Sequence, residues 1–170
     1  AVSAGGLAEA MSRTANSARL AGVNMDTLLG YLAAGGEVTQ RDMATVGETF
    51  KTLFARYSNV KLGNLMDEES GEALNDFEKV LSKVGIKLRN TEDEFRNFDE
   101  VLKEIVSNYD TFTDVEKSAI ASTLGGTRQR ENVLVLFENY DRAMKYATAS
   151  TQSAGTAMEK YEMYQESIEA

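Results

Sequence analysis

Apolar residues recur at intervals of three and four positions along most of the chain, which is the spacing of one face of an α-helix. No proline interrupts this pattern, and proline is the residue that most strongly disrupts a helix interior. The pattern therefore predicts a mainly α protein, a bundle of about seven or eight helices joined by short connections. The widest apolar stripe lies in the third predicted helix and consists of Met43, Val46, Phe50, Leu53, Phe54 and Tyr57.

Glycines and small polar residues mark where these helices are expected to begin and end. Gly85 and the pair Gly35–Gly36 are expected to end helices, because glycine readily adopts the left-handed conformation that closes a helix. Thr39 or Asp42 is expected to begin the third helix, since either side chain can accept a hydrogen bond from a free backbone N–H group. The segment Thr113–Glu116 has the sequence of a capping box, which predicts the start of another helix.

One stretch, IKLRNTEDEFRN, does not follow the helical spacing. Ile86 and Leu88 alternate with charged residues, and the polar sequence NTED separates them from a second short segment that contains Phe95. Alternation beside a polar tip is typical of a β-hairpin. We therefore predict one small hairpin near residues 86–96.

These elements divide the chain into four predicted regions. Helical hairpins occupy residues 1–62, and the acidic sequence GNLMDEESGE forms a loop at 63–72. A helical core that includes the hairpin follows at 73–150. A last helix at 151–170 is expected to continue into a longer chain.

Composition excludes several kinds of chemistry. The chain has no histidine and no cysteine, so it lacks the commonest general base, the thiolate nucleophile and the usual zinc ligands. Its formal charge of -9 argues against stable nucleic-acid binding, which depends on clustered Lys and Arg. The longest uncharged run in the first half, TLLGYLAAGG, is far shorter than a membrane span. No catalytic residue and no cofactor is predicted.

The acidic loop is the most plausible place for a metal ion, but its spacing does not fit one. An EF-hand requires oxygen ligands at alternate positions, a central glycine and a terminal glutamate. The sequence DEESGE, which starts at Asp67 and ends at Glu72, does not follow that order. We therefore expect a solvated acidic loop and no metal site.

A pair of adjacent glycines followed by two arginines, in TLGGTRQREN, allows two interpretations. The first is an anion site, because helix N-termini bind phosphate and this segment opens a predicted helix. However, the spacing matches neither phosphate-binding glycine motif, and the segment follows a helix rather than a strand. The second interpretation, a tight corner between two helices with an arginine paired to carboxylates of a neighbouring helix, fits better. Its residues are Gly125, Gly126, Thr127, Arg128, Arg130 and Asn132.

Four segments, taken in order, resemble the core of phage tail tape measure proteins: VGETFKTLFARYSNVKLG, LNDFEKVLSKVGIKLRNTEDEFRNFDEVLKEIV, EKSAIASTLGGTRQRENVLVLFENYDRAM and SAGTAMEKYEMYQESIEA. The resemblance runs from about residue 7 to residue 170. Its most specific parts are GIKLRNTEDEFRNFDEVL, which starts at Gly85 and contains the predicted hairpin with Phe95, and GGTRQRENVLVLFENYD. The family often has alanine before a single glycine where this chain has Gly125–Gly126.

The resemblance implies a structural role in the tail of a bacteriophage. Tape measure proteins are long helical chains in the lumen of the tail tube, and their length sets the length of the tail. Implied partners are tail tube and distal tail proteins, tail assembly chaperones in the host cytoplasm, and further copies of the chain through its helices. At ejection the chain leaves ahead of the DNA and contacts the host membrane transiently.

Glycine stops and a hairpin favour a folded module over a continuous rod, so the resemblance also implies a rearrangement on assembly or ejection. Two other interpretations remain at this stage. One is a helical protein-binding module unrelated to phage. The other is a murein-hydrolase fragment that uses carboxylate chemistry.

Overall fold

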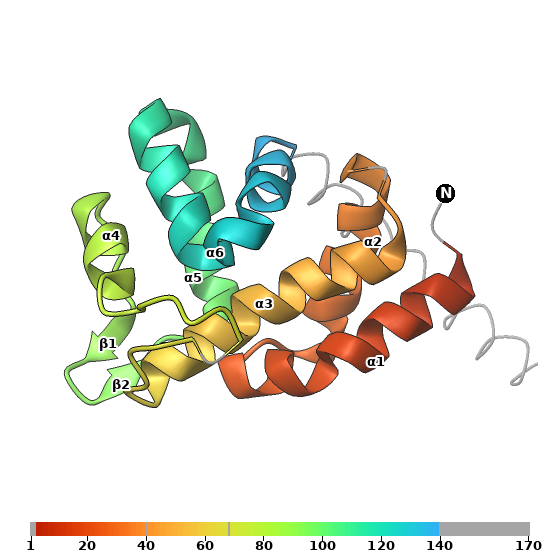
Figure 1. Cartoon of the computed structure of the whole chain (residues 1–170), viewed down its shortest axis with the longest axis horizontal. Helices are drawn as coiled ribbons and strands as arrows, with labels where there is room; N and C mark the ends of the chain where they lie inside the picture. Colours follow the sequence, from red (N-terminus) through yellow and green to blue (C-terminus); the bar gives the residue numbers. More distant parts are fainter. Residues whose placement is uncertain (1–2, 40, 68, 140–170) are drawn as a thin grey trace, which may run out of the picture.

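The computed structural model describes residues 3–39, 41–67 and 69–139. These residues form a mainly helical body with one small antiparallel sheet, as predicted (Figure 1). The elements in chain order are α1 (Ala4–Ala21), α2 (Met25–Thr39), α3 (Met43–Lys61), α4 (Phe77–Lys83), β1 (Arg89–Thr91), β2 (Glu94–Phe95), α5 (Phe98–Ser107), the short 3-10 helix η1 (Tyr109–Thr111) and α6 (Asp114–Glu138).

Helix α3 is the central element of this body. Helix α1 lies along it, and α2 and α6 also pack against it (Figure 1). Its apolar stripe supplies Phe50, Phe54 and Tyr57 to a continuous aromatic core, in which Tyr57 stacks on Phe98 with ring centroids 4.4 Å apart. The predicted stripe therefore faces the protein interior.

The local signals at several helix ends are confirmed. Asp42 begins α3 by accepting a hydrogen bond from the backbone N–H of Thr45, whereas Thr39 is the last residue of α2. At the start of α6, Thr113 accepts from the N–H of Glu116, and the Glu116 carboxylate accepts from the N–H of Thr113. Both halves of the predicted capping box are thus formed.

The predicted helix end at Gly35–Gly36 is wrong, because α2 continues to Thr39. A Cβ atom on Gly35 would lie 3.0 Å from a Val46 methyl carbon and 3.3 Å from the Phe50 ring. Glycine is therefore needed here for close packing of α2 on α3, a long-range requirement that local sequence does not reveal.

The predicted count of seven or eight helices is also wrong for the residues that the structure describes, which contain six α-helices. The two helices expected on either side of the glycine pair form one bent helix, α6, whose backbone departs from helical angles at Gly126. The eighth predicted helix, near residues 158–168, lies outside the described residues.

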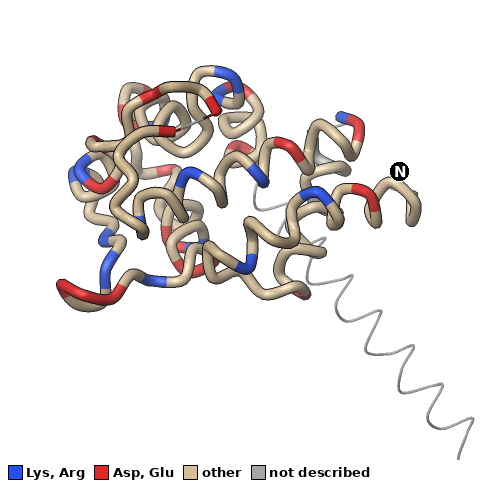
Figure 2. Tube along the Cα trace, turned by 60° about the horizontal axis from the view of Figure 1, so that its bottom comes forward, with Lys and Arg blue, Asp and Glu red and all other residues tan. Residues whose placement is uncertain are grey.

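The predicted hairpin is confirmed but shorter than expected. Arg89 pairs with Phe95 and Thr91 with Glu94 in the two antiparallel strands, whereas Ile86 and Leu88 precede β1 and are buried in the core. The Arg89 guanidinium lies 4.4 Å from the centre of the Phe95 ring and pairs with Glu78 of α4. The acidic hairpin tip is exposed and appears red in Figure 2.

The most extensive helix packing, between α1 and α3, gives a first testable prediction. A Cβ atom on Gly47 would lie 3.2 Å from both Cα and Cβ of Ala10, so Gly47→Val would push the two helices apart. We expect the free energy of unfolding to fall by roughly 1–3 kcal/mol, as measured by urea denaturation. Gly5→Val is the matched control, because a Cβ atom on Gly5 would have no neighbour within 4 Å.

Candidate functional site

The sequence GGTR forms a sharp bend in α6, here called the α6 corner (residues 125–127). Gly126 has φ 70° and ψ -179°, a conformation with positive φ that glycine tolerates far better than other residues. Gly125 is buried against the second half of the helix, and a Cβ atom there would lie 2.8 Å from a Val133 methyl carbon. Each glycine therefore meets a different requirement of the same bend.

The bend separates two backbone groups that would bond to each other in a straight helix. In an α-helix the N–H of Thr127 would donate to the carbonyl of Thr123, four residues earlier. At the corner, Arg56 Nε donates to the Thr123 carbonyl at 3.1 Å. The Thr127 N–H and hydroxyl instead donate to Glu72 Oε1, at 3.1 Å and 2.7 Å. Side chains from α3 and the acidic loop thus satisfy both groups.

Arg56 and Glu72 belong to an ionic network, here called the corner cluster (Arg56, Asp67, Glu72 and Thr127), in which Arg56 and Asp67 are buried. Arg56 Nη1 lies 3.0 Å from Asp67 Oδ2 and 3.5 Å from Glu72 Oε2. The Arg56 side chain is only 4% exposed. Asp67 is also buried and accepts hydrogen bonds from the Ser70 hydroxyl and the Glu69 N–H. The expectation of a solvated loop is therefore wrong for Asp67.

The arginines named from the sequence are not the ones that pair with these carboxylates. Arg130 donates to the Ser118 hydroxyl at 2.7 Å, and within the described residues Arg128 is exposed and forms no ion pair. Sequence reasoning missed Arg56, although its position offered a signal. It lies three residues after Leu53 and four before Val60, so a charged side chain interrupts the apolar spacing of α3.

The remaining predicted residues lie elsewhere. Asn132, in the second half of α6, donates to Gln129 Oε1, which also accepts from the Thr49 hydroxyl of α3. Gly85 follows α4 with φ 83°, and Phe95 is in β2 beneath Arg89. The structure brings Gly126 and Thr127 next to Arg56 and Glu72, whereas Gly85 lies after α4 and Phe95 in the hairpin.

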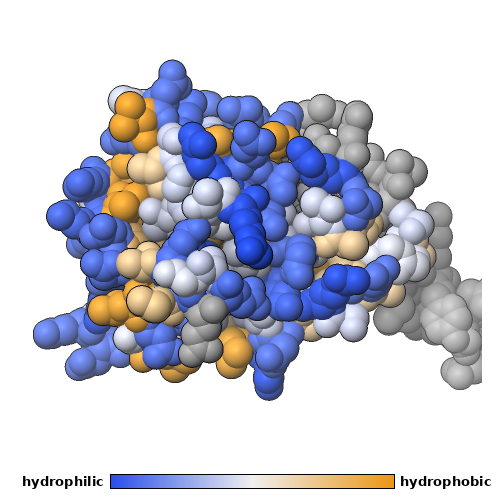
Figure 3. All heavy atoms as spheres, viewed as in Figure 1, coloured by the Kyte–Doolittle hydropathy of each residue, from blue (hydrophilic) through white to orange (hydrophobic). Residues whose placement is uncertain are grey.

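A polar hollow of about 170 Å³ lies beside the corner cluster. Glu48, Glu69 and Arg128 line it together with members of the cluster. The part of the chain that the structure describes has no group of three or more acidic, histidine or cysteine side chains placed to hold a metal ion. The face shown in Figure 1 is largely hydrophilic (Figure 3).

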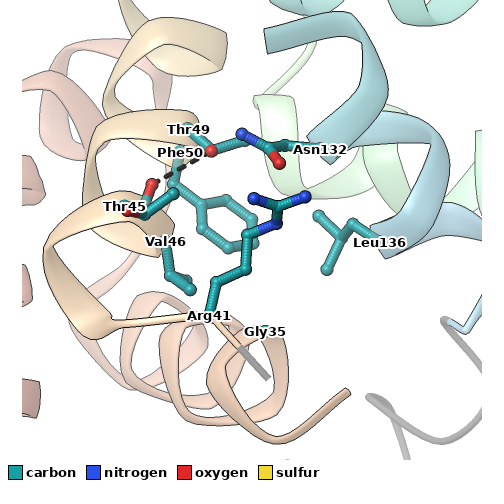
Figure 4. Close-up of a pocket in the computed structure, with 8 residues that line it drawn as sticks. All are labelled: Gly35, Arg41, Thr45, Val46, Thr49, Phe50, Asn132 and Leu136. Atoms are coloured by element: carbon teal, nitrogen blue, oxygen red, sulfur yellow. Dashed lines mark hydrogen bonds between the residues drawn. The ribbon is translucent and has the colours of Figure 1, made fainter. Parts of the chain in front are cut away.

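A second, mostly apolar pocket lies between α2, α3 and α6 (Figure 4). Val46, Phe50 and Leu136 form its walls, and the Arg41 side chain extends across it (Figure 4). Its volume of about 10 Å³ is close to that of a single water molecule, so it cannot admit a substrate.

The corner cluster holds both of its carboxyl groups in the ionised form. For Asp67, burial raises the pKa, but hydrogen bonds from Ser70, Glu69 and Arg56 outweigh burial and leave the pKa below its ordinary value. For Glu72, the hydrogen bond from the Thr127 hydroxyl is the main cause of a lowered pKa. Both carboxylates are therefore stabilised by the folded state.

These shifts predict that the domain loses stability in acid. Because the folded pKa values lie below the ordinary 3.8 of Asp67 and 4.5 of Glu72, the stabilisation is complete above those values and is lost as pH falls through the lower, folded values. Between about pH 6 and pH 3, the free energy of unfolding measured in urea should fall less for Glu72→Gln than for wild type. Glu9→Gln, at an exposed carboxylate of α1, is the control and should leave the pH dependence unchanged.

The fold and the site define a compact helical domain in which an ionic cluster fixes the bend of one helix. None of the described helices is both long and apolar enough to cross a membrane. Residues 1–126 match the model of a family described as phage-related minor tail protein. The chain belongs to this family and is a structural protein of the phage tail. The match includes the hairpin and ends at Gly126 of the corner. No solved structure matches the chain.

Proposed function

We propose that the chain is a segment of a tape measure protein, which sets the length of the phage tail during assembly and leaves the tube ahead of the DNA. Its membership of a phage tail family is the observation that carries this proposal. The tape-measure-like sequences at the hairpin and the corner support it further. The segment would lie in the lumen of the tail, after assembly in the host cytoplasm.

The proposed role requires a change of shape. The described residues enclose a continuous hydrophobic core, whereas a ruler depends on extended length. As one continuous helix, 170 residues would span about 250 Å. We therefore propose that the compact form precedes incorporation into the tail, and that tail tube and distal tail proteins, assembly chaperones or other copies of the chain stabilise the extended form.

Two further parts of the proposal concern DNA and the host envelope. The formal charge of -9 would repel DNA that follows the chain through the tube, so no stable nucleic-acid complex is expected. Contact with the host membrane would be transient and confined to ejection.

Tail length measured by electron microscopy tests the ruler role. An in-frame deletion of residues 1–170 from the parent gene should shorten the tails by about 250 Å, the length of the segment as helix. An in-frame duplication is the matched control, because it keeps every residue needed for assembly, and it should lengthen the tails by the same amount. Tails of unchanged length in both variants would overturn the proposal.

We also propose that the chain has no enzymatic activity of its own. It contains no histidine or cysteine, and Asp67 and Glu72 are both paired with Arg56. The purified chain should release no soluble fragments from murein, and their release would support a hydrolase instead.

A further inference from the structure

The bend of α6 has two alternative sets of hydrogen bonds for the same backbone groups. In the bent form, the Thr123 carbonyl and the Thr127 N–H bond to Arg56 and Glu72. In a straight helix they would bond to each other. The Thr123 carbonyl and the Thr127 N–H therefore each have a partner both in the bent and in the straight form of α6.

The half of α6 beyond the bend, here called the distal segment (residues 127–138), packs on α3 and α2. Its buried apolar residues are Val133, Leu136 and Phe137. Its Gln129 side chain accepts from the Thr49 hydroxyl at 2.8 Å. The surface beneath it, here called the receiving groove, includes Thr49, Val46, Phe50 and Gly35.

We propose that Gly126 is a hinge at which α6 straightens, and that the distal segment then packs into the receiving groove of a second copy of this chain. Two copies that exchange distal segments in this way form a dimer. The corner cluster holds the hinge closed, since Glu72 and Arg56 bond only to the bent form. This inference rests on the fold alone and goes beyond the proposed function.

A second copy is the partner that the structure supports, because the receiving groove already fits the distal segment of this chain. Exchange preserves the contacts of Val133, Leu136 and Phe137, whereas it breaks the bonds of Arg56 and Glu72 to the bend. Exchange of an identical element is a general, low-cost route to a dimer. Straightening also gives an unbroken helix of 25 residues, about 37 Å long, which carries the distal segment away from its own groove.

The variant Gly126→Ala tests the hinge directly. Alanine disfavours φ 70° and favours a continuous helix, so the hinge should open. Light scattering coupled to size exclusion should show the molar mass doubling, at concentrations where wild type remains a monomer. The control is Gly85→Ala, which places alanine at φ 83° with no neighbour within 4 Å and should remain monomeric.

Two single-cysteine variants distinguish exchange from association through another surface. The chain has no cysteine of its own, so Thr49→Cys and Gln129→Cys can each be introduced into the Gly126→Ala chain and then mixed. Exchange places Thr49 of one copy against Gln129 of the other, and mild oxidation should give a mixed disulfide dimer. A dimer without this disulfide, or a folded Gly126→Ala chain that remains monomeric, would overturn the proposal.

If Gly126→Ala fails to fold, Glu72→Ala keeps the glycine and removes the bonds to Thr127 together with the ion pair to Arg56. With the same two single-cysteine substitutions, Glu72→Ala chains should form the mixed disulfide at a several-fold lower protein concentration than chains that are otherwise wild type. A folded Glu72→Ala chain with no increase over wild type would also overturn the proposal.

Discussion

Replacing Arg56 with methionine is expected to lower the free energy of unfolding by about 3–5 kcal/mol, because the substitution leaves buried charge without its partner. The Arg56 side chain is 4% exposed and neutralises both Asp67 and Glu72. It also satisfies the Thr123 carbonyl at the bend of α6. Methionine keeps most of the packing of the aliphatic part of the arginine side chain, so the decrease in the free energy of unfolding is due to loss of the guanidinium group. This decrease is measured by urea denaturation followed by circular dichroism.

The matched control for this prediction is Arg89→Met. Arg89 pairs with Glu78 at 2.8 Å, a shorter distance than in either ion pair of Arg56, but both side chains are about 40% exposed. Water competes for exposed ion pairs, so this substitution should lower the free energy of unfolding far less than Arg56→Met does. If the two variants lost the same free energy of unfolding, the corner cluster would stabilise the fold no more than a surface ion pair does.

The features of the fold that sequence predicted are those that depend on neighbouring residues. The capping box at Thr113 joins groups three residues apart, and the hairpin bonds connect positions within one short segment. A glycine pair followed by a polar residue likewise indicated a corner. Local chemistry was sufficient in each of these cases.

The features that sequence did not predict join distant positions. Arg56 bonds to Thr123, which is 67 residues away, and Glu72 bonds to Thr127, which is 55 residues away. The acidic loop therefore appeared solvated, and the wrong arginines were chosen as its partners. Gly35 lies in the interior of a helix because of its contacts with α3, not because of its own conformation. Packing between elements decides these positions.

Replacing Tyr57 with alanine is expected to lower the free energy of unfolding by about 3–5 kcal/mol, the usual cost of deleting a buried aromatic ring. Tyr57 is fully buried at the centre of the aromatic core, where it stacks on Phe98 and contacts Phe77 and Phe95. Its ring therefore connects α3 to α4, α5 and the hairpin. Loss of the ring should expose all of these elements together, in a single cooperative transition measured by urea denaturation.

The hydroxyl group of Tyr57 can be tested separately from its ring. It donates to the backbone carbonyl of Arg96, and burial raises the pKa of Tyr57, so the group stays a neutral donor. Tyr57→Phe leaves this carbonyl without its donor and should cost about 1–3 kcal/mol. Tyr109→Phe is the matched control, because the buried Tyr109 hydroxyl has no hydrogen-bond partner among the described residues. Removing an unsatisfied hydroxyl should be neutral or stabilising, so a loss at Tyr109 as large as that at Tyr57 would contradict the assignment.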